Sequence, residues 1–150
     1  MDAVVPAHDA ATTIGAVLAG LPLRRFRSAI VVDNASSDAT AAIARDHGAV
    51  VLREGEVGYG AACLTALAHL AQLPRPPDVV VFIPGDGSAD PADVPALLPP
   101  ILDDNAELVI GVRRFTGGGR PGARTRATVR LEHTGDSADR RSSLNPSEPY

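Results

Sequence analysis

The feature that most constrains this chain is the alternation of short apolar runs with segments of helical period. Between the apolar runs, hydrophobic residues return every three or four positions, as Ile14, Val17, Leu18 and Leu21 do. Strands are expected at residues 3–7, 28–33, 49–52, 78–83 and 107–111. Helices are expected at residues 12–21, at 37–47 with Gly48 beyond the end, at 60–73, and from Pro91 onward behind an Asp90 cap.

This order predicts an α/β fold with a mostly parallel, Rossmann-like sheet and helices on both faces, because continuously apolar strands are typical of sheets covered on both sides. In such sheets a ligand lies beyond the carboxyl ends of the strands. The polar residues at these ends are therefore the candidates: His8 and Asp9, Asp33 and Asn34, residues 53–59, Asp86, and Arg113.

Length, net charge and cysteine content exclude several classes of function. The 150 residues suffice for one domain, and a net charge of −4 argues against a nucleic-acid partner. Cys63 is the sole cysteine and is expected to be a small core residue. No apolar run has the length of a membrane span, and the first residues lack the pattern of a signal peptide, so a cytoplasmic protein is expected.

Two strand ends carry the acids of most interest. Asp33 precedes a run of small polar residues, where it could accept hydrogen bonds from a nucleobase or a ribose, or could stabilise a turn together with Ser36. Asp86 follows a strand within Pro84-Gly85-Asp86-Gly87, where the glycines would let the backbone approach a phosphate closely.

Glycines also mark the third helix. Gly58 and Gly60 stand at its expected entry, where exposed N–H groups favour phosphate, although a helix entry without a ligand explains them equally well. A G-x-G-x-x-G motif after the first strand and a P-loop are both missing, which argues against dinucleotide oxidoreductases and P-loop NTPases.

The character of the chain changes after Arg114. Residues 115–150 have almost no apolar periodicity, and with Arg113 and Arg114 they contain eight of the fourteen basic residues. A disordered basic tail is expected, either without a role or in contact with an anionic membrane surface, and an out-of-frame or truncated end would also explain it.

Taken in order, the segments VVPAHDAATTIGAVLAGL, AIVVDNASSDATAAIARDHGAVVL, GYGAACLTAL, VFIPGDGSADPADVPALL and AELVIGVRR resemble the family 2 glycosyltransferases of GT-A fold. Within that family they look most like the polyprenyl-phosphate branch, similar to dolichol-phosphate-mannose synthases. The resemblance covers residues 3–114 and implies a nucleotide-sugar-binding domain at 1–114.

The resemblance also implies roles for single residues. Pro6, Ala7 and Asp9 would line the nucleotide, as would Gly58 and Gly60 at the helix entry. Asp33 and its neighbour Asn34 would meet the base or ribose. Asp86 would hold a Mg²⁺ or Mn²⁺ ion at the diphosphate, and Arg113 would offset the charge of the leaving group.

Three positions depart from the family pattern. Asp9-Ala10 stands in place of Asn-Glu, Asn34 in place of a second Asp, and Pro84 in place of the first acid of D-x-D. The third departure leaves Asp86 as the one metal ligand expected here. Mg²⁺ is commonly held by one or two carboxylates with phosphate oxygens and water, so a single acid is compatible with metal binding.

The expected function is therefore inverting, metal-assisted transfer of a hexose from a GDP- or UDP-sugar to a polyprenyl phosphate or another glycan acceptor. With a polyprenyl phosphate, the protein would work at the inner face of the plasma membrane. A phosphate acceptor is already largely anionic at neutral pH and has little need of a general base. The alternative is a non-catalytic nucleotide-binding or partner-binding half-domain that lacks the acceptor side.

Overall fold

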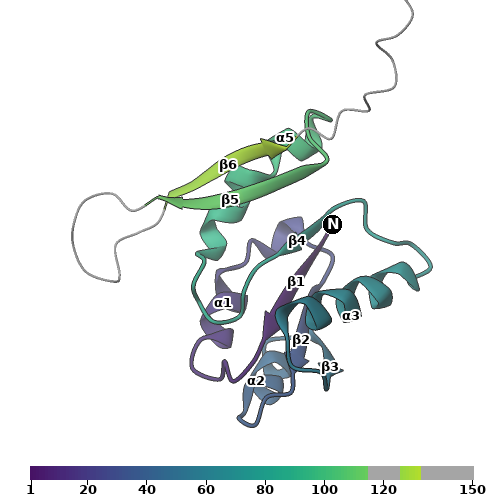
Figure 1. Cartoon of the computed structure of the whole chain (residues 1–150), viewed down its shortest axis with the longest axis vertical. Coiled ribbons are helices and arrows are strands. Elements are labelled where there is room, and N and C mark those ends of the chain that lie inside the picture. Colours follow the sequence, from purple (N-terminus) through teal and green to yellow (C-terminus); the bar gives the residue numbers. More distant parts are fainter. Residues whose placement is uncertain (115–125, 133–150) are drawn as a thin grey trace, which may run out of the picture.

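A computed structural model describes residues 1–114 and 126–132, with side chains through residue 112. The first part consists of β1 (Asp2–Ala7), α1 (Ile14–Gly20), the 3-10 helix η1 (Leu23–Arg25), β2 (Ala29–Asn34), α2 (Thr40–Asp46), β3 (Val50–Glu54), α3 (Tyr59–Ala71) and β4 (Val80–Phe82). The second part consists of the 3-10 helix η2 (Pro91–Asp93), α4 (Val94–Leu97), α5 (Pro99–Leu102), β5 (Leu108–Arg114) and β6 (Arg126–Glu132) (Figure 1).

Four parallel strands form the main sheet in the order β3-β2-β1-β4. In the register, Val4 of β1 lies opposite Ile30 of β2 and Phe82 of β4. The chain winds outward from β1 to β3 and then returns to the other side of β1 to form β4. The predicted parallel sheet is thus confirmed for four strands, and the winding direction reverses between β1 and β4.

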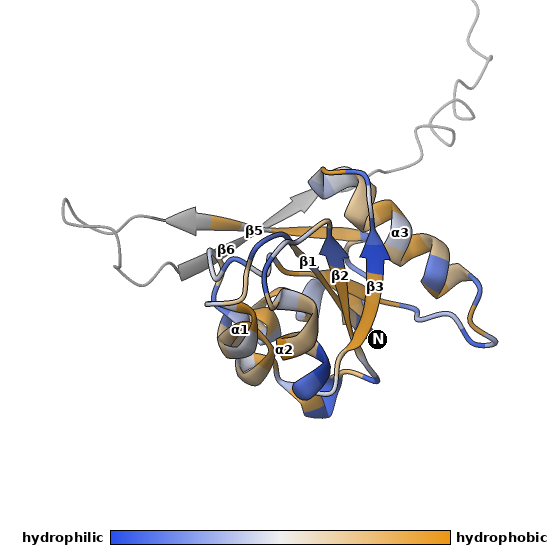
Figure 2. Ribbon diagram, turned by 90° about the horizontal axis from the view of Figure 1, so that it is seen from below, coloured by the Kyte–Doolittle hydropathy of each residue, from blue (hydrophilic) through white to orange (hydrophobic). Residues whose placement is uncertain are grey.

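Each face of this sheet is covered by helices, as predicted. Val5 and Val31 point into a core with α1, α2 and α4, whereas Val4, Ile30 and Val32 pack against α3. Figure 2 shows α1 and α2 on one side of the sheet and α3 on the other. This two-sided burial explains why the strands read as unbroken apolar runs.

The α2 segment differs from the prediction at its start. Ser37 is not the N-cap, because α2 begins at Thr40 with Ala39 as the preceding residue. Asp38 instead accepts a hydrogen bond from the Thr40 N–H at 2.9 Å, while Ser37 is turned toward Asp9. The expected end is confirmed, since Gly48 follows the helix with a φ of 77°, a conformation that glycine adopts without strain.

The helix expected behind Asp90 is broken into short pieces. Asp90 does cap it, and its Oδ1 accepts from the Ala92 N–H at 2.9 Å. Proline then recurs, and Pro99 opens α5 one residue after α4 ends. A proline lacks the N–H donor of a helical hydrogen bond, so one continuous helix does not form, even though Leu98 before Pro99 keeps helical φ and ψ.

The last two strands correct the sequence-based expectation. The fifth strand was expected in the parallel sheet, but β5 pairs with β6 in a separate antiparallel sheet, with Gly111 opposite Val129. β6 lies within the segment predicted to be disordered, and the rest of that segment lies outside the described residues. The signal for β6 was the alternation of Ala127, Val129 and Leu131 with polar residues, which is typical of a half-exposed strand.

Within the described ranges, no helix combines the length and the apolar character that crossing a membrane requires.

Candidate functional site

The fold topology itself indicates where a ligand would bind. In open parallel sheets, ligands occupy the crevice beyond the carboxyl ends of the strands where the winding direction reverses. Here that point lies between β1 and β4. Four loops follow the carboxyl ends of the strands around it, at residues 8–13, 35–39, 55–58 and 84–90.

Asp33 is held at the end of β2. Its side chain is only 5% exposed, and its Oδ1 accepts from the Ser36 N–H at 3.2 Å. Its Oδ2 lies 3.8 Å from Nε of Arg53, the residue that β3 places opposite it, and the Arg53 side chain is 78% exposed. Asp33 therefore does stabilise the turn, and its second oxygen faces a cation that solvent or a ligand can reach.

Asn34 is buried beside it and joins two loops. Its amide nitrogen donates to the Glu56 carbonyl at 2.5 Å, and its Oδ1 accepts from the Gly58 N–H at 2.7 Å. These bonds need a donor and an acceptor on one side chain, which an amide supplies and a carboxylate does not. Asn34 thus fixes the entry of α3, and its direct contact with a nucleotide stays a prediction.

Asp9 braces the loop after β1 against the loop after β2. Its Oδ1 accepts from both the N–H, at 2.8 Å, and the hydroxyl of Ser37, and its own N–H donates to Ser36 Oγ at 3.1 Å. The next two backbone N–H groups donate to Thr40 Oγ1 and Asp38 Oδ2. This network sets the shape of the crevice wall, and contact of Asp9 with a nucleotide stays a prediction.

His8 shares this wall. Its Nδ1 lies 2.6 Å from the Asn34 carbonyl, which can only accept, so Nδ1 carries the proton. The predicted residues Pro6 and Ala7 are buried at the end of β1, where they border the loop after β4.

The loop that carries Asp86 lies against the end of β1. The Gly85 N–H donates to the Pro6 carbonyl at 2.9 Å, which extends the β1–β4 pairing beyond Phe82. A Cβ atom on Gly85 would come within 2.8 Å of the Ala7 Cβ, so a side chain at this position would force the two segments apart. Asp86 Oδ1 accepts from the Ser88 N–H at 2.8 Å, and the Asp86 side chain remains exposed.

The N-terminus of α3 stands across the crevice from this loop. Burial raises the pKa of Tyr59, and its interaction with Cys63 and the negative charge of Asp86 raise it further. Burial likewise raises the pKa of the Cys63 thiol, which keeps it protonated at neutral pH as expected for a structural cysteine.

The two predicted glycines at this helix entry both lie beside open space. The Gly58 N–H donates to Asn34 Oδ1, and a Cβ placed on Gly58 or on Gly60 would meet no other part of the fold within 4 Å. The structure therefore brings Asp9, Asp33, Gly60 and Asp86 to one end of the sheet. Arg113 lies in β5, and its side chain is outside the described part, so its role stays a prediction.

The residues present fit a divalent cation only if a bound diphosphate and water supply most of its ligands. Residues 84–88 carry a single acid, Asp86, and residues 1–112 contain no group of three or more His, Cys, Asp or Glu side chains able to enclose a metal. A cation at Asp86 would therefore take further oxygens from a diphosphate and from water, a ligand set that Mg²⁺ commonly uses.

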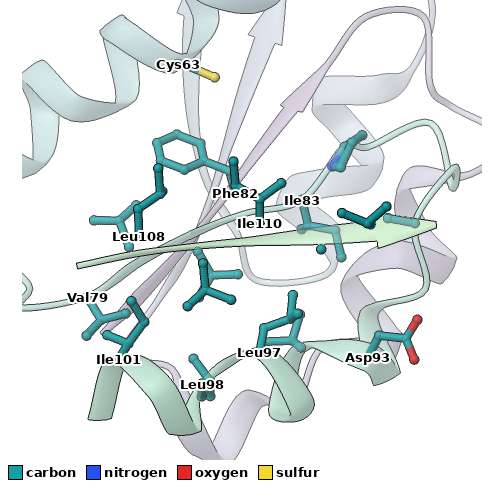
Figure 3. Close-up of a pocket in the computed structure, with 18 of the residues that line it drawn as sticks. Cys63, Val79, Phe82, Ile83, Asp93, Leu97, Leu98, Ile101, Leu108 and Ile110 are labelled. Carbon is teal, nitrogen blue, oxygen red and sulfur yellow. The ribbon is translucent and has the colours of Figure 1, made fainter. Parts of the chain in front are cut away.

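An apolar groove of about 660 Å³ begins beside this loop. Tyr59, Pro84 and Ser88 line the end near Asp86, and the remainder runs between β4, β5 and the helices α4 and α5. Figure 3 shows Phe82 on one side of β5 and Leu97, Leu98 and Ile101 on the other. Most of the groove therefore lies away from the acids, and only its mouth belongs to the crevice.

Sequence reasoning did not assign several residues of the site. Arg53 and Tyr59 lay in a segment singled out as a strand end, but neither was given a role. Thr13, whose hydroxyl donates to the Gly85 carbonyl at 2.7 Å, had no local signal, because 72 residues separate the partners.

Comparisons with known proteins agree with this geometry. The model of the family described as glycosyl transferase family 2 matches residues 2–147. An uncharacterised glycosyltransferase of Mycobacterium tuberculosis is 41% identical over 115 residues, which cover 77% of this chain and 49% of the relative. Glycosyltransferase AglJ of Haloferax volcanii is 33% identical over 123 residues, which cover 82% of this chain and 38% of that protein. The chain thus spans half or less of the length of these relatives.

Solved structures with the same fold include glucosyl-3-phosphoglycerate synthase from Mycobacterium tuberculosis. Its complex with Mn²⁺, UDP and glucosyl-3-phosphoglycerate has a TM-score of 0.57 and 30% identity, over 67% of this chain and 39% of that one. Its complex with Mg²⁺ and UDP has a TM-score of 0.58 and 31% identity, over 67% and 38% of the two chains.

Proposed function

The chain belongs to glycosyltransferase family 2, and on that premise we propose that it binds a nucleotide-diphospho-sugar and transfers the hexose with inversion. The observation that carries the proposal is the placement of Asp33 and Asp86 at one end of a GT-A-like parallel sheet, on either side of the point where the winding reverses. Because the structural relative glucosyl-3-phosphoglycerate synthase was solved with UDP in both of these complexes, a UDP-sugar is favoured over a GDP-sugar.

In this proposal each acid has a distinct task. Asp33 accepts a hydrogen bond from the base or the ribose, while Arg53 offsets part of its charge. Asp86 would hold a Mg²⁺ or Mn²⁺ ion, which would stabilise the charge that develops on the diphosphate, and Arg113 would supply a second positive charge there. Gly85 allows this loop to lie directly against β1 and so close to the nucleotide.

We further propose a polyprenyl phosphate as the acceptor, with another glycan as the alternative. The apolar groove begins at the Asp86 loop and would suit a hydrocarbon chain whose phosphate lies at its mouth. Such an acceptor is largely anionic near neutral pH and needs placement more than deprotonation. With it, the protein would act in the cytoplasm at the inner face of the plasma membrane.

Thermal unfolding with nucleotides tests the donor half of the proposal. UDP or UDP-glucose with Mn²⁺ should stabilise the chain by about 2.7 kcal/mol at 100 times the Kd, a shift of several degrees in Tm. GDP serves as the matched comparison, and Mn²⁺ alone as the control. If no nucleotide moves the transition, the chain is a non-catalytic half-domain and the transferase proposal fails.

A further inference from the structure

Thr13 stands at the start of α1 but does not act as its cap. It occupies the N-cap position with a φ of −120°, and its side chain makes no capping hydrogen bond to the helix. A threonine here would ordinarily satisfy a free N–H of the first turn. Its hydroxyl donates across the crevice instead, to the Gly85 carbonyl at 2.7 Å, with the Ala10 carbonyl farther away at 3.2 Å.

The same side chain also supports the residue on the other side of Asp86. The Thr13 Cγ2 lies 3.5 Å from where a Cβ on Gly87 would stand, so the methyl group lies directly beside that part of the backbone. Gly87 has a φ of 72°, which sets the direction in which the loop turns after Asp86. One side chain therefore bonds one neighbour of Asp86 through its hydroxyl and lies near the other with its methyl group.

Two further hydrogen bonds hold the same loop through its N–H groups. The Gly85 N–H is tied to Pro6 and the Ser88 N–H to the Asp86 carboxylate, so both bonds hold N–H groups of the loop. The Thr13 hydroxyl is the group that fixes the Gly85 carbonyl, and through it the peptide plane that leads into Asp86. Because Gly85 is buried, loss of this bond has a larger effect than loss of an exposed one.

We propose that Thr13 is a positioning residue for Asp86, which orients the carboxylate toward the place where the diphosphate and its cation bind. This inference rests on the proposed function. Thr13 touches neither the nucleotide nor the cation and acts through the backbone at residues 85–87. Its removal should therefore weaken the cooperation between nucleotide and metal, and leave the contacts of Asp33 with the nucleoside intact.

The test uses the full chain with a matched pair of substitutions. Thr13→Val keeps the methyl group and puts a second methyl in place of the hydroxyl, whereas Thr13→Ser keeps the hydroxyl. The affinity for UDP is measured by calorimetry with and without Mn²⁺, and the ratio of the two values is the metal enhancement. Thr13→Val should reduce the enhancement about five- to tenfold and leave the metal-free affinity within about twofold, and Thr13→Ser should restore most of it.

Hydrogen exchange of the apo chain gives a readout without any ligand. The amides of residues 85–88 should exchange faster in Thr13→Val, while those of β2 and β3 keep their rates. If Thr13→Val does not fold, Thr13→Ala carries the same expectation.

The inference is overturned if Thr13→Val keeps the wild-type enhancement, if Thr13→Ser loses as much as Thr13→Val, or if metal-free affinity falls in parallel. If the wild-type chain binds no nucleotide at all, the proposed function fails and the inference with it. If the wild type binds UDP with metal enhancement and Thr13→Val matches it, the inference fails alone.

Discussion

At Asp86, the question is whether a lone carboxylate between two glycines binds a cation or only closes a turn. Its Oδ1 does close a turn with the Ser88 N–H. The carbonyl oxygen of an asparagine side chain could accept the same bond, so Asp86→Asn removes the charge and keeps the turn. We expect this variant to lose the metal-dependent part of UDP binding and to keep its metal-free affinity and apo Tm, as measured by calorimetry and thermal unfolding.

Asp90→Asn provides the matched control for that experiment. Asp90 lies four residues further along the chain, and its carboxylate is committed to the Ala92 N–H. The substitution should leave metal dependence as it is. A fall in apo Tm for Asp86→Asn together with unchanged metal dependence would show that Asp86 is structural.

Asn34 offers a second test at the residue scale. Asn34→Asp would remove the donor to the Glu56 carbonyl and place a second negative charge beside Asp33. We expect the free energy of unfolding to fall by roughly 1–3 kcal/mol, measured by urea unfolding, since the buried side chain at position 34 loses a hydrogen bond and gains a charge. The same change at exposed Asn105 should have little effect. Equal stability of Asn34→Asp and the wild type would contradict the role given to this amide.

At the scale of elements, the antiparallel pair β5–β6 is separate from the parallel sheet. Thr128 lies in the middle of β6, opposite Val112. In Thr128→Pro the backbone has no N–H at this position to donate a hydrogen bond between the strands. We expect hydrogen exchange to show protected amides over residues 126–132 in the wild type. Protection should be lost there in the variant, while β1 and β2 keep theirs. Absence of protection at these residues in the wild type would contradict β6.

Helices and strands with a clear hydrophobic periodicity could be predicted from the sequence. A strand whose placement depends on pairing with a distant strand could not. The strands β1, β2 and β3 and the helix α3 were placed within a few residues, because their apolar runs are buried on both faces or along one side. The placement of β5 depended on β6, a strand more than ten residues away in a segment rich in Arg. Periodicity within a window does not report such pairing.

In the candidate site too, some residues could be predicted from the sequence and others could not. Asp33 and Asp86 could be found because polar residues that end parallel strands meet at one edge of the sheet. The bracing of Asp9 by Ser37, and of Gly85 by Thr13, joins residues 28 and 72 positions apart and has no sequence signal. Those contacts depend on how the loops pack, which the strand pattern alone does not determine.

At the scale of the whole molecule, three carboxylates join segments that are distant in the chain, and all three have a lowered pKa. Burial tends to raise the pKa of Asp2, but the hydrogen bonds from Arg27 and Ser28 and the charge of Arg27 outweigh it. The pKa of Asp38 is lowered by hydrogen bonds from Thr40 and Ala11, and that of Glu54 by bonds from Thr65 and Glu56. The hydrogen-bond partners of each carboxylate therefore stabilise its charged form relative to its protonated form.

This pattern predicts how stability depends on pH. A carboxylate whose folded pKa lies below its unfolded value contributes stability that is complete above the unfolded value, here 3.8 for Asp2 and Asp38 and 4.5 for Glu54. That contribution is lost as the pH falls through the folded pKa, because the unfolded chain then binds more protons. We expect the urea midpoint to drop steeply below about pH 5, measured in steps from pH 6 to 2.5.

A double variant separates these carboxylates from the general effect of acid on the chain. Asp38→Asn and Glu54→Gln together remove two of the three titrating groups and keep side chains that can accept hydrogen bonds from Thr40 and Thr65. The midpoint should then vary less steeply with pH, while Asp2, paired with Arg27, still contributes its share. An unchanged slope would show that the acid sensitivity arises elsewhere, and that the links made by Asp38 and Glu54 add little to the stability of the charged protein.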